Sequence, residues 1–327
     1  MILVTGSSGF IGHAIAERLE NQDITGIDLL HSESPRYREI IGDITDRNFL
    51  GKLEPLSDLR AIVHTVALIS SAYCQQNPYD AFRVNLTGTL NMLELARRYD
   101  VPKFVYISSG GIYGTTDPDA VIDEKRLPDP RGIYSTTKVC SELAVKEYCE
   151  SYSLNAASLR ITAPYGPRMN GSRYPFQIPD SLHRHTLIFA IKCALSQDII
   201  MPVGGDHTVN YTYVGDIAEG VALSMKASFR GFEAFNIAGG KNYSISELGQ
   251  AVKELCPKIK VSIGPGDLTK GYDENDPMLS KLHIRQGLFD TSKASRMLGF
   301  RPSYSLKSGM KELISYIRSQ MPSKGQN

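Results

Sequence analysis

Two side chains that can move a proton lie four residues apart, a phenol at Tyr134 and an ammonium at Lys138. In a helix this spacing places both side chains on one face, one turn apart. A nearby cation lowers the pKa of a phenol from its ordinary ~10 toward neutral pH. The pair therefore predicts proton transfer at Tyr134, although the same spacing also occurs in helices that carry no chemistry.

A hydroxyl group joins this pair from another part of the chain. Ser109 lies in the segment 108–114, which directly follows the apolar run Phe104–Ile107. If that run is a strand of a parallel sheet, Ser109 stands at its carboxyl end, where binding sites open in such sheets. We therefore expect Ser109 beside a bound small molecule.

A glycine-rich turn with the sequence TGSSGFIG occupies residues 5–12, between a first apolar strand and a helical pattern. Glycines there permit a tight turn and let backbone amides approach a pyrophosphate at the helix N-terminus. A glycine cluster alone could be only a turn, but this one lies inside a strand–helix–strand unit. We expect dinucleotide contacts at Gly6, Gly9, Phe10, Ile11 and Gly12.

The choice of dinucleotide depends on Asp28, which ends the second strand. A carboxylate there accepts hydrogen bonds from an adenosine ribose 2′-hydroxyl and repels a 2′-phosphate. Its neighbours Leu29 and Leu30 supply no arginine, so the sequence favours NAD over NADP unless Asp28 is an incidental surface residue. Asp43 is a weaker candidate for the adenine edge, because aspartate is also common in turns.

The elements that position these residues alternate between strands and helices. Apolar runs predict strands at Ile2–Val4, Ile24–Ile27, Ala61–Val66, Phe104–Ile107, Ala157–Ile161 and Phe235–Ala238. Helical patterns lie between them at Ile11–Leu19, Asn85–Tyr99 and Ser135–Tyr152. This alternation predicts an α/β fold, a Rossmann-type doubly wound parallel sheet covered by helices on both faces.

The pattern changes after Tyr165, where a stretch rich in Gly, Pro, Arg and Tyr has no clear period. Ser244 and Glu247 form a capping box that begins a later helix, and Leu306–Ile317 is an amphipathic helix near the end. We expect residues 1–165, with 209–238 returning to them, to form the NAD-binding domain. Residues 166–208 and 239–327 would form a smaller C-terminal substrate-binding lobe.

Composition narrows the class of protein. Thirty-six Lys and Arg against 35 Asp and Glu give a net charge of +1, so no strong overall field attracts nucleic acid or an anionic membrane. Apolar stretches stay well short of the ~20 residues of a membrane helix, and no secretory signal is evident. The five scattered cysteines are expected to be reduced. The sequence thus favours a cytoplasmic enzyme without nucleic-acid or membrane partners.

Several ordered motifs resemble the extended short-chain dehydrogenase/reductase family, in its NAD-dependent epimerase/dehydratase branch. The resemblance covers nearly the whole chain. It rests on TGxxGxxG at residue 5, SSxxIYG at 108, YxxxK at 134, LR at 159 leading to YGPR at 165, YVGD at 213, and DTSK at 290 followed by LGF at 298.

The resemblance implies roles for the three chemical residues. Tyr134 would move the hydroxyl proton, Ser109 would polarise the substrate oxygen, and Lys138 would hold the nicotinamide ribose. Asn85 matches a position that supports the active-site network, although an Asn that begins a helix is an equal alternative. Further cofactor contacts are expected at Asp43, Ile44, Val66 and Ala67. Family members commonly pair the helices near 85–99 and 135–152, which implies a homodimer.

Departures from the family pattern narrow the reaction. Dehydratases and decarboxylases of the family carry acidic residues directly after the catalytic hydroxyl, whereas this chain has Gly110 and Gly111. Hydride and proton transfer alone are then expected. That chemistry fits an NAD-dependent epimerase of a nucleotide sugar or, alternatively, a dehydrogenase of a free sugar, sugar acid or other polar hydroxyl substrate. A catalytically idle NAD-sensing protein would not need the three residues together.

The residues expected to contact the substrate also depart from the family pattern. Ala163 and Val209 replace an Asn and an Arg that contact the diphosphate in sugar-nucleotide epimerases of the family. Substrate contacts are expected at Ser109, Gly110, Arg173 and Arg285. Of these, Arg285 matches a family arginine late in the substrate lobe. The loop 168–185 carries a second basic set, which is either a replacement anion site or a solvated loop: Arg173, His183, Arg184 and His185. Two histidines without a carboxylate or cysteine cluster do not predict a metal site.

Overall fold

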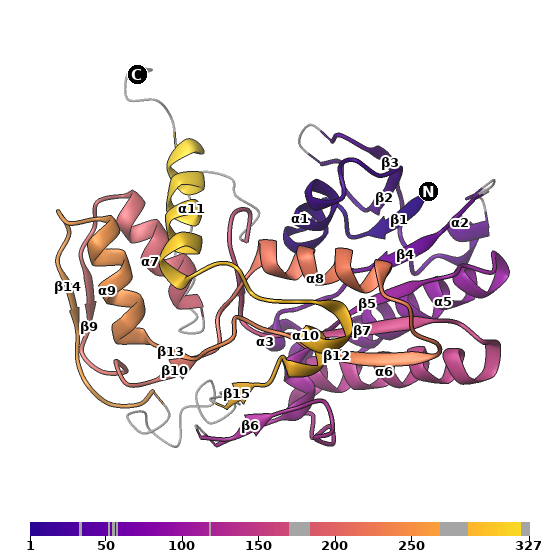
Figure 1. The fold of residues 1–327 in the computed structure, drawn as a ribbon. Helices are drawn as coiled ribbons and strands as arrows, with labels where there is room; N and C mark the ends of the chain where they lie inside the picture. Colours follow the sequence, from indigo (N-terminus) through magenta and orange to yellow (C-terminus); the bar gives the residue numbers. More distant parts are fainter. Residues whose placement is uncertain are drawn as a thin grey trace.

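The computed structural model describes residues 1–32, 35–51, 53, 56, 58–117, 119–169, 184–268 and 287–321. Its centre is a seven-stranded, wholly parallel sheet with strand order β12-β7-β5-β4-β1-β2-β3 (Figure 1). The strands are β1 (Ile2–Thr5), β2 (Ile24–Asp28), β3 (Arg38–Ile41), β4 (Ala61–His64), β5 (Phe104–Ser109), β7 (Ala156–Ile161) and β12 (Phe232–Ile237). The predicted Rossmann-type fold is confirmed.

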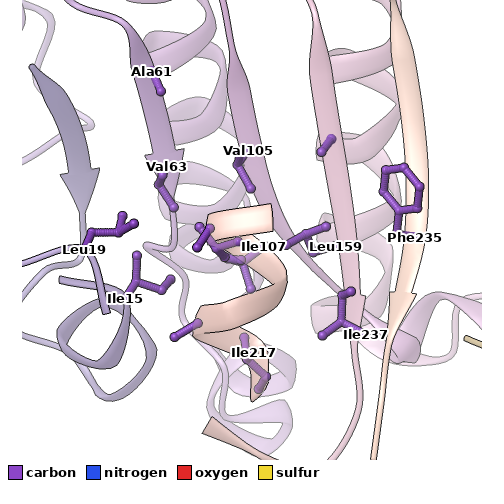
Figure 2. Close-up of a cluster of buried hydrophobic side chains, with 14 of the residues drawn as sticks. Ile15, Leu19, Ala61, Val63, Val105, Ile107, Leu159, Ile217, Phe235 and Ile237 are labelled. Carbon is purple, nitrogen blue, oxygen red and sulfur yellow. The ribbon is translucent and has the colours of Figure 1, made fainter. Parts of the chain in front are cut away.

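Helices cover both faces of this sheet, because most of its strands are apolar on both sides. One face packs against α1 (Phe10–Arg18) and α8 (Val214–Lys226). Figure 2 shows this layer, in which Ile15 of α1 and Ile217 of α8 meet Val63, Ile107 and Leu159 of the strands. The opposite face packs against α5 (Gly88–Arg98) and α6 (Gly132–Tyr152).

Shorter elements connect these layers. They are α2 (Arg47–Gly51), α3 (Ser71–Gln76), α4 (Pro78–Phe82), the π-helical segment η1 (Arg83–Thr87), the 3-10 turn η2 (Gly110–Tyr113), β6 (Val121–Ile122), β8 (Pro164–Tyr165) and β11 (Thr212–Tyr213). Near the carboxyl end of the chain, β15 (Leu288–Phe289) pairs with β6, and α10 (Ser292–Leu298) packs on the core of the central sheet.

A smaller lobe with its own apolar core lies beside the carboxyl ends of the central strands (Figure 1). Its helices are α7 (His185–Ala194), α9 (Ile245–Leu255) and α11 (Leu306–Ser319). Its strand pairs are β9 (Ile199–Met201) with β14 (Val261–Ile263) and β10 (Thr208–Val209) with β13 (Tyr243–Ser244). The predicted capping box of Ser244 and Glu247 begins α9 as expected.

One prediction about the cysteines is wrong. The sequence predicts five reduced thiols, but Cys193 and Cys256 form a disulfide that joins α7 to the end of α9. The lobe core brings their Cα atoms within 6.1 Å although they are 63 residues apart. Cys74, Cys140 and Cys149 are free thiols.

In the part of the chain that the structure describes, no helix is both long and apolar enough to cross a membrane.

Candidate active site

The glycine turn joins the end of β1 to α1, and close packing dictates its glycines. Gly6 has a φ of +73°, and a Cβ there would lie 2.5 Å from the Thr65 hydroxyl oxygen. A Cβ on Gly12 would collide with the Gly6 carbonyl oxygen. Gly9 caps α1 without a side chain, so the first amides of that helix remain directed toward the turn. This is the backbone arrangement that binds a pyrophosphate.

Asp28 ends β2 beside this turn. Its Oδ2 accepts a hydrogen bond from the Ser8 amide at 3.0 Å, and its Oδ1 accepts one from the Leu29 amide at 2.7 Å. The side chains of Leu29 and Leu30 are exposed. The carboxylate is therefore fixed by backbone amides at the point where an adenosine ribose would follow the pyrophosphate. The cradle and the carboxylate together fit NAD.

The other expected cofactor residues lie in different environments. Asp43 Oδ1 accepts from the Thr45 amide at 2.8 Å and its Oδ2 is 3.6 Å from the Arg83 guanidinium, so it has a turn-forming role of its own. Ile44 is buried in the core beneath α5. Val66 and Ala67 are half-buried in the segment after β4. Of these four residues, Ile44 is the one whose side chain is part of the hydrophobic core.

Lys138 is buried on α6 and points to the end of β5. Its Nζ donates to the Ile107 carbonyl oxygen at 2.8 Å and lies 4.8 Å from the centre of the Tyr106 ring. Burial lowers the pKa of Lys138 to about 7, while the negative charge of Glu142 opposes this shift. The protonation of the Lys138 amine near neutral pH therefore depends on the charges around it.

Ser109 and Tyr134 lie on the two elements that this lysine connects, β5 and α6. Ser109 is the last residue of β5, two positions beyond the carbonyl that Lys138 contacts, and its hydroxyl accepts from the Gly111 amide at 2.9 Å. Tyr134 is half-buried in the first turn of α6, one turn before Lys138. The fold thus brings β5 and α6 together around a hydroxyl, a phenol and an ammonium.

Asn85 links the helix layer to the segment that follows β4. Its side-chain amide accepts from the Leu68 amide at 2.7 Å, donates to the Leu68 carbonyl at 3.1 Å and donates to the Thr137 hydroxyl at 2.9 Å. The expectation that a helix begins at Asn85 is wrong, because helical turns run without a break from α4 through η1 into α5. The π-helical turn leaves the Asn85 carbonyl to the hydroxyls of Thr89 and Ser141, at 2.6 and 2.9 Å.

Gly110 has no room for a side chain. A Cβ there would lie 2.6 Å from the ring of Phe289, which is buried against the turn η2. The absence of an acidic side chain after Ser109 is therefore built into the packing of this site.

Of the remaining predicted substrate residues, the structure describes two and leaves three undescribed. Arg173, His183 and Arg285 lie outside the described residues. Arg184 precedes α7, and His185 is its first residue, buried with its ring 6.4 Å from that of Phe189. His185 therefore belongs to the lobe core and not to a solvated loop. Among the described residues, no cluster of three or more His, Cys, Asp or Glu side chains could hold a metal ion.

Sequence reasoning missed His64, at the end of β4. Its ring nitrogens lie 2.7 Å from the Thr5 hydroxyl and 3.0 Å from the Thr89 hydroxyl. Burial, with a smaller effect of the Lys138 charge, lowers the pKa of His64 to about 3. The imidazole is therefore neutral and connects β1, β4 and α5 below the glycine turn. A histidine inside an apolar strand is the signal that could have drawn attention to it.

A second missed group lies where the two lobes meet. The Asn210 Nδ2, Tyr211 hydroxyl and Thr212 hydroxyl are buried and have no hydrogen-bond partner among the described residues. The Thr212 amide donates to Ala163 O at 3.2 Å, which places them beside one of the departures from the family pattern. Buried polar atoms without partners are costly, so a ligand that supplies partners would be favoured here. Three consecutive polar residues before the helix at 214 are the signal in the sequence.

This chain is similar in sequence to members of one known protein family. Residues 2–238 match the model of the NAD dependent epimerase/dehydratase family. A putative UDP-glucose 4-epimerase of Methanocaldococcus jannaschii is 30% identical over 98% of this chain and 99% of its own length. A UDP-glucuronate 4-epimerase of Thermodesulfobacterium geofontis is 28% identical over 98% and 96%.

Among solved structures, UDP-glucose 4-epimerase of Thermotoga maritima, determined with UDP-glucose, has a TM-score of 0.79 at 26% identity and covers 97% of this chain and 98% of its own. The enzyme of Thermus thermophilus, in complex with NAD, has the same TM-score and identity, with coverages of 98% and 99%. By sequence, fold and glycine turn, this chain belongs to the NAD dependent epimerase/dehydratase family.

Proposed function

We propose that this protein is an NAD-dependent epimerase of nucleotide sugars that inverts the hydroxyl-bearing C4 of the sugar. The observation that carries the proposal is the hydrogen bond from Lys138 to the Ile107 carbonyl, which holds the helix of Tyr134 and Lys138 against the end of β5. Ser109 ends this strand, and Phe289 fills the space behind Gly110. The site has groups for moving a proton and none at residue 110 for eliminating water.

Held by the glycine turn and Asp28, NAD would supply reversible hydride transfer to and from the sugar carbon. The chain's residues have the complementary tasks. Tyr134 takes the proton of the sugar hydroxyl and later gives it back. Ser109 holds the oxygen that loses this proton, and Lys138 holds the nicotinamide ribose and favours the phenolate of Tyr134 through its charge.

The named relatives support the substrate class, since those at 26–30% identity include 4-epimerases of UDP-glucose and UDP-glucuronate. In this proposal residues 1–165 and 209–238 bind NAD, while the lobe of 166–208 and 239–327 binds the nucleotide. The buried polar atoms of Asn210, Tyr211 and Thr212 lie at the junction of these parts, where a sugar nucleotide would offer them hydrogen-bond partners.

The test is to incubate the protein with UDP-glucose, UDP-galactose or UDP-glucuronate and follow the sugar by proton NMR. An epimerase converts one C4 epimer into the other without net formation of NADH. Accumulation of NADH in proportion to product would instead establish the dehydrogenase alternative. Thermal unfolding with UDP, GDP, dTDP and CDP complements this test, since a ligand that binds the native state raises its melting temperature; no shift with any nucleotide would contradict the proposal.

We also propose a cytoplasmic homodimer that pairs α5 and α6 of each protomer. These two helices pack together on one face of the sheet (Figure 1), and Leu143 projects from the middle of α6 with 58% of its surface exposed. Light scattering should show a dimer at micromolar concentration. Leu143→Glu should yield the monomer, whereas Lys311→Glu, at an exposed position on α11 of the smaller lobe, is the matched control. A monomeric wild type would refute this pairing.

A further inference from the structure

Glu142 lies one helical turn beyond Lys138 on α6, and both side chains are almost completely buried, at 6% and 3% exposure. A buried carboxylate requires partners. Glu142 Oε2 accepts from the Ser158 hydroxyl at 2.7 Å, and Oε1 accepts from Arg160 Nε at 3.1 Å and from Arg160 Nη2. The carboxylate of Glu142 is therefore held in a fixed place next to the lysine.

Arg160 connects Glu142 to the turn η2 through the Tyr113 hydroxyl. Its Nη1 donates to the Tyr113 hydroxyl at 2.8 Å and to the Glu124 carbonyl at 3.2 Å. The Tyr113 hydroxyl in turn donates to Asn236 Oδ1 at 2.8 Å. Tyr113 ends the turn η2, which begins directly after Ser109. One buried ion pair thus connects the helix of Lys138 with the turn that follows Ser109.

We propose that Glu142 and Arg160 are positioning residues for proton transfer, with Glu142 keeping Lys138 charged and Arg160 fixing the turn after Ser109. This inference rests on the proposed function for its kinetic consequence only. Stability alone gives little reason for such a pair, because replacing a buried ion pair by apolar groups is often neutral or stabilising.

Among the groups around Lys138, Glu142 carries the charge that favours the protonated lysine. The titratable side chains that face the lysine from β4, β5 and α6, together with the partner of Glu142 on β7, are His64, Tyr106, Tyr134, Glu142 and Arg160. His64 is neutral because its pKa is about 3, and burial raises the pKa of Tyr106 well above its ordinary value. Glu142 is the group whose charge opposes the loss of the Lys138 proton.

Helix geometry decides which catalytic group Glu142 affects more. Along α6 the rise from Glu142 to Lys138 is about 6 Å and to Tyr134 about 12 Å. The attraction to the ammonium therefore exceeds the repulsion of the phenolate. Loss of the Glu142 charge should leave Lys138 neutral at neutral pH and so favour protonated Tyr134.

The experiment compares wild type with Glu142→Gln/Arg160→Met, which removes both charges together and leaves no unpaired one. The readout is the titration of Lys138 by NMR in protein labelled with ¹³C and ¹⁵N in lysine, with the Lys138→Met spectrum for assignment. We expect the pKa of Lys138 to fall by about one unit in the double variant. The acidic limb of the pH profile of kcat/KM should move to higher pH.

Ser158→Ala is the matched control, because it removes a hydrogen bond to Glu142 and keeps the charge. It should retain the wild-type Lys138 titration and pH profile. A folded double variant with the wild-type Lys138 titration would overturn the proposal. If the wild type epimerises no nucleotide sugar, the proposed function fails, but the Lys138 titration still decides this inference. If the double variant does not fold, Glu142→Gln/Arg160→Gln, in which two neutral amides replace the ion pair, provides the same comparison.

Discussion

Lys138 Nζ donates to the carbonyl oxygen of Ile107 at 2.8 Å, which fastens α6 to β5 just before the strand reaches Ser109. The bond occupies one of three ammonium protons and leaves the others for groups that enter the site. The lysine is thus a structural contact between helix and sheet as well as a candidate catalytic residue, and its substitution should affect both stability and reaction.

Tyr134→Phe should leave NAD binding intact and reduce turnover by roughly 10²–10⁴-fold, the usual scale of general acid–base catalysis. The change removes the transferable proton and keeps the ring that packs in the first turn of α6. Turnover and the dissociation constant of NAD measure the two effects separately. Tyr148→Phe is the matched control, since Tyr148 lies on the same helix but contacts Glu94. Wild-type turnover in Tyr134→Phe would remove the mechanism, including the role of Ser109.

The stability of the NAD-free protein should depend on pH through Lys138. Its pKa is about 7 in the folded chain against an ordinary 10.5, so between these values the unfolded chain binds the extra proton. The free energy of unfolding should then rise with pH from about 7 to 10.5, with a slope of up to about 1.4 kcal/mol per pH unit from this group. Below pH 7 both states are protonated, and the full cost of burying the charge remains.

Lys138→Met should abolish this contribution and weaken NAD binding. Urea unfolding of both proteins at several pH values gives the comparison, in which the difference between variant and wild type isolates Lys138 from other titrating groups. A difference that stays constant from pH 7 to 10 would mean that Lys138 keeps its ordinary pKa in the fold.

Asp28→Ala should narrow the preference for NAD over NADP. The carboxylate would accept from the ribose 2′-hydroxyl of NAD and repel the extra phosphate of NADP. We expect the dissociation constant of NAD to increase and that of NADP to decrease. Titration calorimetry with both dinucleotides measures the change. Tighter binding of NADP by the wild type would contradict the assignment.

Gly12→Ala should destabilise the protein by about 2–3 kcal/mol and weaken NAD binding, because the new methyl group would collide with the Gly6 carbonyl. Gly51→Ala is the matched control. No atom lies within 4 Å of a Cβ at residue 51, which ends α2. Chemical unfolding and NAD titration of both variants separate a local packing conflict from a general effect of losing glycine. Equal stability of the two variants would show that the turn can relax.

The sequence was sufficient for most strands of the central sheet because these strands contain short apolar runs, as at Ile2–Val4 and Phe104–Ile107. It did not predict β3, whose residues Arg38–Ile41 are partly exposed at the sheet edge. An edge strand contacts the core on fewer sides, so its composition is mixed. The turn at Asn85 was missed for another reason, since a π-helical turn inside a continuous helix leaves no capping signal.

For the candidate site too, some features could be predicted from the sequence and others could not. Motifs with fixed local spacing, such as Tyr134 with Lys138, could be predicted because one helix positions both residues. Relationships across the chain could not, including Phe289 behind Gly110, Arg160 between Glu142 and Tyr113, and the disulfide of Cys193 with Cys256. These depend on tertiary packing, and sequence separation carries no information about them. The roles of the site residues stay predictions.

Phe289 makes the packing of the turn η2 depend on a segment that is far away in the sequence. Its ring supports Gly110 and lies edge-on to Tyr113, at 5.8 Å, and Asn236 donates to the Asp290 carbonyl. The turn η2 directly follows β5, whereas β15, which supplies its supporting surface, comes after α9 and β14 in the sequence. We expect β1, β4 and β5 to be able to pair before β15 is synthesised, and the turn η2 to gain its packing against Phe289 only afterwards. A chain that lacks β15 should therefore form these central strands but have no support behind Gly110.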